Sequence, residues 1–194
     1  ARPKKAMVYD LGGGTFDVSL VQYTPTHFQV LATDGDTELG GVDWNERLAN
    51  YVADEFQARH GDDPRDSEQT MQVLRNECDI RKIELTEKTE TKLTCRHNGK
   101  TINLKMTREK FDQLTADLLQ RTSDTVQLVL EQAKMSPKEL DAVVLVGGST
   151  IMPQVRQMMT SVMGREPYTG LSPYISVALG AAIHAAILEA QNRP

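Results

Sequence analysis

The sequence predicts an α/β protein, and two stretches at opposite ends of the chain carry this prediction. Near the start, β-type residues 6–9 and Phe16–Tyr23 flank three consecutive glycines, which indicates a hairpin with a tight turn. Near the end, Ala142–Val146 is a short apolar run followed by Gly-Gly and a helical pattern, as in a buried parallel strand. Because core strands come from both ends, neither half of the chain is expected to fold without the other.

After the hairpin the chain continues the sheet and then becomes helical. Residues 28–33 predict a third strand of a meander, and Asp34-Gly35-Asp36 is a turn signal. A helix is expected from about Asp43, whose side chain can cap it. The apolar stripe of this helix predicts a core made by Trp44, Leu48, Tyr51, Val52 and Phe56.

The middle of the chain predicts a helix, a hairpin and a long helical stretch. A break at residues 60–64 precedes a helix over residues 67–85, with Met71, Leu74, Cys78 and Leu85 on one face. Residues 91–106 indicate a hairpin that turns at Asn98-Gly99. Thr107 is expected to cap a helical stretch that runs to about residue 134. Because that length is unusual, a kink is expected at residues 121–124.

The last part of the chain predicts two helices. The first runs over Pro153–Met163, and proline suits its first position. The second, over residues 175–190, is alanine-rich and amphipathic. Its alanines and Gly180 are expected to let it pack closely on the sheet.

Composition limits the class of protein. A chain of 194 residues can form one ordinary domain or two small ones. The net charge of −5 gives nucleic-acid binding little support, and no apolar run is long enough to span a bilayer. Cys78 and Cys95 lack a metal or redox spacing, which indicates a reducing compartment, so we expect a cytoplasmic protein. The linker-like first five residues indicate a piece of a longer protein, expected to be monomeric.

The turn between the first two strands has the composition of a phosphate site. Its glycines lack Cβ atoms, so consecutive N–H groups can form a concave anion site: Gly12, Gly13 and Gly14. Thr15 can donate its hydroxyl to a phosphate oxygen. Asp10 and Asp17 flank the turn and suit Mg²⁺, bound directly or through water. The alternative is a glycine-rich turn with solvated aspartates.

A second glycine pair and one helix face are further candidates. Gly147 and Gly148 lie between a strand and a helix N-terminus, where anions and nucleotides bind, although a tight βα turn is the alternative. Asp79, Lys82 and Thr86 share one face of the second helix. For that face the alternative is an ordinary solvated surface.

Residues 10–20, DLGGGTFDVSL, resemble the second phosphate loop of the actin-like ATPase superfamily, and in detail that of the heat-shock protein 70 (DnaK-type) chaperones. LGG at 39–41, LVGGST at 145–150 and GAA at 180–182 match the same family in the same order. The resemblance covers nearly the whole chain. It implies the second lobe of the chaperone ATPase domain: a ribonuclease-H-like core, residues 1–60 and 136–194, with an inserted α+β subdomain at 61–135.

The resemblance also implies ligands and partners. ATP or ADP with Mg²⁺ is expected at the glycine turn, with further contacts from Asp79, Lys82, Ile83, Thr86, Gly147, Gly148, Ser149 and Ile151. Partners implied for the intact protein are a nucleotide exchange factor that grips residues 61–135, a J-domain co-chaperone and unfolded clients; no nucleic acid or membrane is expected. The family's first phosphate loop, catalytic lysine and first-lobe carboxylate have no counterpart here. ATP hydrolysis is therefore expected of the intact protein, with little or none from this chain alone.

Several positions depart from the family pattern. Ile151 stands where the family has an arginine that stacks on adenine, and Val42 stands where it has glutamate. Tyr174 and Ile175 replace two acidic residues, and Asp79 is shorter than the usual glutamate. The chain therefore resembles a divergent member. Two alternatives stay open: an actin-like filament or scaffold protein, and a pseudo-enzyme lobe that binds partners without nucleotide.

Overall fold

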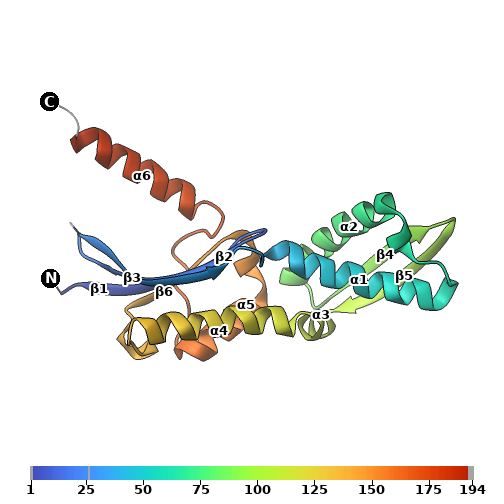
Figure 1. Cartoon of the computed structure of the whole chain (residues 1–194), viewed down its shortest axis with the longest axis horizontal. Helices are drawn as coiled ribbons and strands as arrows, with labels where there is room; N and C mark the ends of the chain where they lie inside the picture. Colours follow the sequence, from blue (N-terminus) through green and yellow to red (C-terminus); the bar gives the residue numbers. More distant parts are fainter. Residues whose placement is uncertain (1, 26, 192–194) are drawn as a thin grey trace.

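The computed structural model describes residues 2–25 and 27–191 and contains two β-sheets flanked by helices (Figure 1). The larger sheet has the strand order β3-β2-β1-β6, formed by β1 Lys4–Leu11, β2 Phe16–Tyr23, β3 Phe28–Asp36 and β6 Ala142–Val146. The first three strands form an antiparallel meander, and β6 pairs in parallel with β1. The two ends of the chain thus share one sheet, and the predicted α/β class is confirmed.

The turn expected at Asp34-Gly35-Asp36 is wrong, because these residues extend β3. They pair with Val18, Asp17 and Phe16 of β2. The glycine serves a close approach between strands: a Cβ at Gly35 would lie 2.5 Å from the carbonyl oxygen of Phe16. A glycine inside a strand often marks such an approach, which sequence alone does not separate from a turn.

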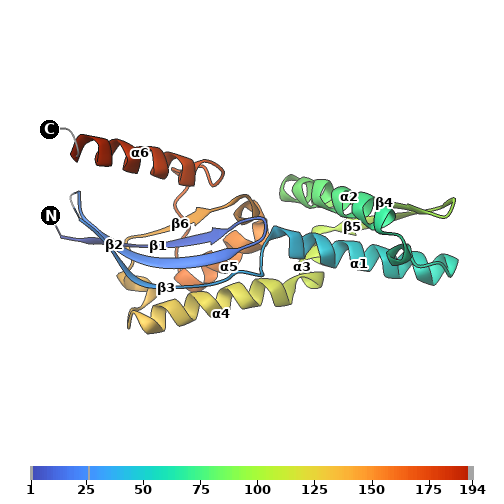
Figure 2. The same ribbon diagram turned by 45° about the horizontal axis from the view of Figure 1, so that its top comes forward.

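The second sheet is the predicted hairpin of β4 Glu90–His97 and β5 Lys100–Thr107. Asn98 and Gly99 have φ values of 47° and 74°, the positive values that a tight type I′ hairpin turn requires. Two helices, α1 Gly41–His60 and α2 Glu68–Glu87, lie alongside this hairpin (Figure 2). A short 3-10 turn, η1 Pro64–Asp66, connects them.

α1 begins two residues earlier than predicted. Asp43 is the third residue of the helix and not its cap, but it still caps the end, because its Oδ2 accepts the N–H of Gly40 at 2.7 Å. The backbone of residues 41 and 42 bonds to the glycine turn, and this draws the helix start back to Gly41. Of the predicted stripe, all members are fully buried except Tyr51, which is half-buried.

The long helical stretch divides into α3 Arg108–Leu114 and α4 Ala116–Gln132, so the kink expected at 121–124 is wrong. The break is at Thr115, which is buried. Its hydroxyl donates to the carbonyl oxygen of Phe111 at 2.9 Å and accepts from the amide of Gln154 at 3.2 Å. A side chain that bonds to nearby backbone competes with regular helix, and its distant partner is not visible in the sequence. Thr107 caps α3 as predicted, by accepting the N–H of Lys110.

Two helices follow β6, and only the first of them agrees with the prediction in full. After the 3-10 turns η2 Pro137–Glu139 and η3 Gly148–Ile151, α5 Pro153–Met163 has the predicted bounds. The close packing expected for α6 Ser176–Gln191 is wrong: its apolar residues are exposed, and no atom lies within 4 Å of a Cβ built at Gly180. Both views show α6 standing away from the large sheet (Figures 1 and 2). The turn before it sets its direction, and composition does not specify that turn.

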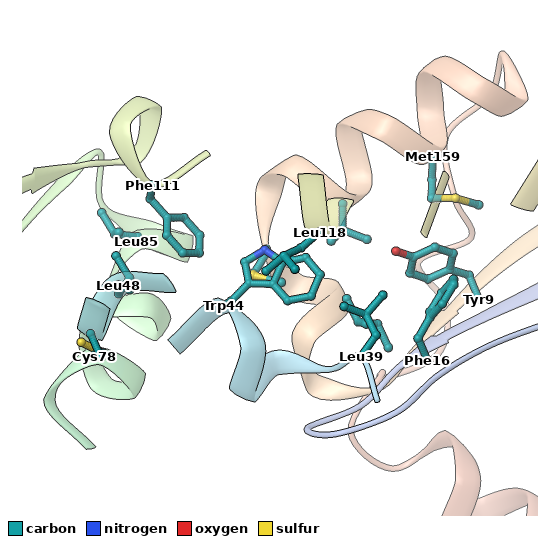
Figure 3. Close-up of a cluster of buried hydrophobic side chains, with 14 of the residues drawn as sticks. Tyr9, Phe16, Leu39, Trp44, Leu48, Cys78, Leu85, Phe111, Leu118 and Met159 are labelled. Atoms are coloured by element: carbon teal, nitrogen blue, oxygen red, sulfur yellow. The ribbon is translucent and has the colours of Figure 1, made fainter. Parts of the chain in front are cut away.

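One connected core joins the two sheets (Figure 3). Tyr9 and Phe16 lie with ring centroids 4.8 Å apart on the large sheet, and Trp44 and Leu118 lead toward Cys78 and the rest of the buried cluster between α1 and α2. α4 packs on β2, β3 and α5, whereas α1 packs on α2 and the second sheet. The division into residues 1–60 with 136–194 and residues 61–135 stays a prediction, and these contacts favour boundaries nearer to 40 and 115.

Candidate functional site

The glycine turn closes β1 onto β2 with one backbone bond, from the N–H of Gly12 to the carbonyl oxygen of Thr15 at 2.9 Å. Gly13, Gly14 and Thr15 are exposed. The N–H groups of Gly13 and Gly14 make no hydrogen bond to any other described residue. No atom lies within 4 Å of a Cβ built at either glycine. The turn therefore presents open donors, which is what an anion site needs.

The start of α1 is bonded directly to this turn. The N–H of Gly41 donates to the carbonyl oxygen of Gly12 at 3.0 Å, and the N–H of Val42 donates to that of Gly13 at 2.8 Å. Gly40 crosses so closely that a Cβ there would lie 2.4 Å from the nitrogen of Gly14. The LGG motif thus packs closely against the glycine turn and holds its backbone in position.

The second glycine loop reaches the same point from β6. Gly147 has a φ of 87°, and a Cβ there would lie 2.2 Å from the carbonyl oxygen of Leu11. The hydroxyl of Ser149 donates to the carbonyl oxygen of Gly12 at 2.9 Å. That one carbonyl therefore accepts hydrogen bonds from both Gly41 and Ser149. Three segments distant in sequence meet there: the glycine turn, the start of α1 and the loop after β6.

Lys82 on α2 ties that helix to the same cluster. Its ammonium donates to the carbonyl oxygen of Gly41 at 2.9 Å and lies 3.1 Å from Oδ1 of Asp79. Burial lowers the pKa of Lys82, and the interaction with Asp79 opposes this shift. For Asp79, burial raises the pKa, but hydrogen bonds from Asn45 and Lys82 outweigh it and the net pKa is lowered. The ammonium of Lys82 is thus engaged within the protein.

These segments surround a cavity of about 210 Å³. The lining contains Gly13 of the glycine turn and the α2 face predicted above, together with the second loop: Asp79, Lys82, Ile83, Thr86, Gly148, Ser149 and Ile151. The volume is below the roughly 300–1,000 Å³ typical of a complete small-molecule site. The cavity can hold part of such a ligand, and the neighbouring glycine turn can bind the remaining part.

The cavity also has lining residues that the sequence did not single out as ligand contacts: Gly41, Val42, Asn45, Met152 and Tyr174. Asn45 donates to Oδ1 of Asp79 at 2.9 Å, and its own Oδ1 is buried with no partner among the described residues. A buried acceptor without a partner costs about 1–3 kcal/mol, so a ligand hydroxyl here would be stabilising. The only sequence signal that points to Asn45 is its position about one helical turn after the LGG motif.

Asp10 and Asp17 face each other directly across β1 and β2. Burial, and next the charge of Asp17, raise the pKa of Asp10. Neither carboxylate makes an ion pair or side-chain hydrogen bond within residues 2–25 and 27–191. Like charges directly opposite on neighbouring strands destabilise a sheet. This donor set fits a divalent cation, although the described residues contain no group of three or more metal-ligating side chains.

Comparison with known proteins agrees with the resemblance drawn from the motifs. A family model for the Hsp70 protein matches residues 1–194. The chain belongs to the Hsp70 family. It is 39% identical over 197 residues to the chaperone protein DnaK of Thermosipho africanus, covering 98% of this chain and 33% of that relative. For DnaK of Thermotoga petrophila the identity is 41% over 194 residues, covering 96% and 33%.

The chain thus spans about a third of the length of these Hsp70 relatives. Its mixed sheets and helices agree with the actin-like ATPase fold implied by the motifs. In the described part of the chain, no helix has the length and apolar character needed to cross a bilayer.

Proposed function

We propose that this chain forms one side of the ATP- or ADP-binding site of an Hsp70-type chaperone. The observation that carries the proposal is that Gly13 belongs both to the open glycine turn and to the lining of the cavity. Phosphates at the turn and a nucleoside in the cavity can therefore belong to one ligand. Phosphate contacts are assigned to the turn of residues 12–15, where the N–H groups of Gly13 and Gly14 are the free donors. Asn45 offers an unpartnered acceptor for a ribose hydroxyl.

The proposed nucleoside contacts are those implied by the family motifs. Ile83 and Ile151 supply apolar walls, and Asp79 and Thr86 supply polar groups. The role of Lys82 is to hold α2 against the start of α1, because its ammonium bonds to Asp79 on α2 and to the carbonyl oxygen of Gly41 on α1. Gly147, Gly148 and Ser149 bring the backbone close to the ligand.

Asp10 and Asp17 are proposed to hold Mg²⁺, through water. When bound, the ion would offset the repulsion between these carboxylates and neutralise phosphate charge. The raised pKa of Asp10 supports this, because the pair lacks a compensating cation among the described side chains.

The activity of the intact protein is a further part of the proposal. Its DnaK relatives are chaperones, which supports nucleotide-dependent binding of unfolded clients in the cytoplasm with a J-domain co-chaperone. Residues 61–135 are proposed to bind a nucleotide exchange factor, and the chain alone is proposed to be a monomer with little or no ATPase activity. NMR titration with an exchange factor tests the partner surface; shifts confined to the large sheet would contradict it.

The nucleotide site can be tested with a substitution that the fold tolerates. Gly13→Ala meets no atom within 4 Å, yet it adds a methyl group to the open turn. Gly180→Ala on α6 is the matched control, since its Cβ position is equally open. We expect Gly13→Ala to keep the melting temperature and weaken Mg-ADP binding by about tenfold, the equivalent of one lost charge-assisted bond.

Binding is measured by NMR titration into the millimolar range, so that a weak complex is still detected. Unchanged binding in Gly13→Ala would show that phosphates do not bind at the turn. A wild-type chain that binds neither Mg-ADP nor pyrophosphate would refute the nucleotide site and favour a pseudo-enzyme lobe.

A further inference from the structure

The segment between α5 and α6 is fastened to the second glycine loop. The N–H of Gly147 donates to the carbonyl oxygen of Pro173 at 3.0 Å. Ser172 then accepts backbone bonds from Ile175 at 3.3 Å and from Ser176 at 3.2 Å, which forms a tight turn. The residue held between these bonds is Tyr174. Its position is therefore set by the same loop that borders the cavity.

The ring of Tyr174 lies over Gly148 at the edge of the cavity. A Cβ built at Gly148 would lie 3.1 Å from Cε1 and 3.6 Å from Cδ1 of this ring. Tyr174 lines the cavity and is nevertheless 65% exposed. Within the described chain, its ring has no aromatic partner and its hydroxyl has no hydrogen bond. A large apolar ring is thus left open beside a concave site.

Tyr174 is also the one aromatic side chain among the described lining residues. The other apolar walls are aliphatic or thioether groups: Val42, Ile83, Ile151 and Met152. Aliphatic groups offer burial, whereas an aromatic ring can also stack on the π-face of a nucleobase. Stacking gains with ring area, so it favours a purine over a pyrimidine.

We propose that Tyr174 is the base-stacking residue of this site and gives it a preference for purine over pyrimidine nucleotides. This role rests on the proposed nucleotide site. The base lies in the cavity against the Tyr174 ring, with Ile83 and Ile151 completing its apolar surroundings. The bond between Gly147 and Pro173 fixes the backbone that carries Tyr174 beside the cavity, so the backbone needs little ordering when the ligand binds.

The test compares three variants of the full chain by NMR titration with Mg-ADP, Mg-CDP and pyrophosphate. Tyr174→Ala removes the ring, Tyr174→Phe keeps the stacking surface, and Tyr168→Ala removes a similarly exposed tyrosine, at 56%, that lines a different cavity. We expect Tyr174→Ala to weaken Mg-ADP binding by about tenfold and Mg-CDP binding by less. Tyr174→Phe and Tyr168→Ala should stay within about twofold of wild type.

Pyrophosphate separates this inference from the function on which it rests, because it has no base. Tyr174→Ala should leave pyrophosphate binding unchanged, while Gly13→Ala should weaken it. If the wild type binds Mg-ADP and Tyr174→Ala binds it equally well, the stacking role is overturned and the nucleotide site stands. A Tyr174→Phe variant as weak as Tyr174→Ala also overturns it. If the wild type binds neither Mg-ADP nor pyrophosphate, both the site and the stacking role are refuted.

Discussion

Replacing Lys82 with methionine should destabilise the fold by about 1–3 kcal/mol, the contribution of a buried hydrogen bond from a charged donor. The Lys82 side chain is only 9% exposed, and its ammonium is the side-chain donor bonded to the carbonyl oxygen of Gly41, at 2.9 Å. Methionine preserves most of the apolar stem but removes that donor. The partner Asp79 is 50% exposed and can be rehydrated, so the lost ion pair adds at most about 1 kcal/mol. For a total loss of about 1–4 kcal/mol in a chain of this size, the melting temperature should fall by about 2–16 °C.

The assay is urea and thermal unfolding followed by circular dichroism. Lys88→Met, at the C-terminal cap of the same helix, is the control, because Lys88 is 63% exposed and its ion pair with Glu84 is 3.7 Å long. The control should change stability by less than about 0.5 kcal/mol. Equal losses in the two variants would refute the role of the buried bond to Gly41. A loss of the same size in Asp79→Asn would show that the ion pair carries the stability instead.

Three other substitutions test separate parts of the site. Gly147→Ala should cost about 2–5 kcal/mol, because its φ is 87° and the new Cβ would lie 2.2 Å from the carbonyl oxygen of Leu11, whereas Gly164→Ala, with a φ of 64° and open space, should cost about 1 kcal/mol in the same unfolding assay. Asp10→Asn should raise the melting temperature in metal-free buffer. Because the pKa of Asp10 is raised in the fold, the wild type loses stability as pH rises through that pKa, and the difference in melting temperature between variant and wild type should disappear below about pH 4. A difference that persists at low pH would contradict this cause. Ile151→Arg should tighten Mg-ADP binding up to roughly tenfold through a cation–π contact, and unchanged affinity by NMR titration would show that Ile151 does not face the base.

The motifs predicted which segments carry the candidate site because their geometry is local. Three glycines between two β-type runs specify a turn with free N–H groups, and Asp79, Lys82 and Thr86 share a face through helical spacing alone. The structure brings both to one cavity through Gly13 and α2. What spacing did not indicate was that the ammonium of Lys82 is engaged by Gly41, a residue 41 positions away.

The errors share a physical cause, since each depends on a partner that is distant in sequence. Gly35 extends a strand because Phe16 and Asp17 lie against it, and the helix breaks at Thr115 beside Gln154. The packing expected of α6 failed for a similar reason: apolar composition favours burial but does not specify the surface that buries it.

By itself, the sequence determined the elements whose signals lie within a few residues: the glycine turn, the Asn98-Gly99 hairpin, the start of α5 at Pro153 and the family to which the motifs point. The tertiary structure alone decided that the carbonyl oxygen of Gly12 accepts from both Gly41 and Ser149, and that Tyr174 stands at the cavity. Local backbone preference acts over one turn of helix or strand. This candidate site is assembled by close approaches between segments that are distant in sequence, up to 137 residues apart, and only the packed chain fixes those.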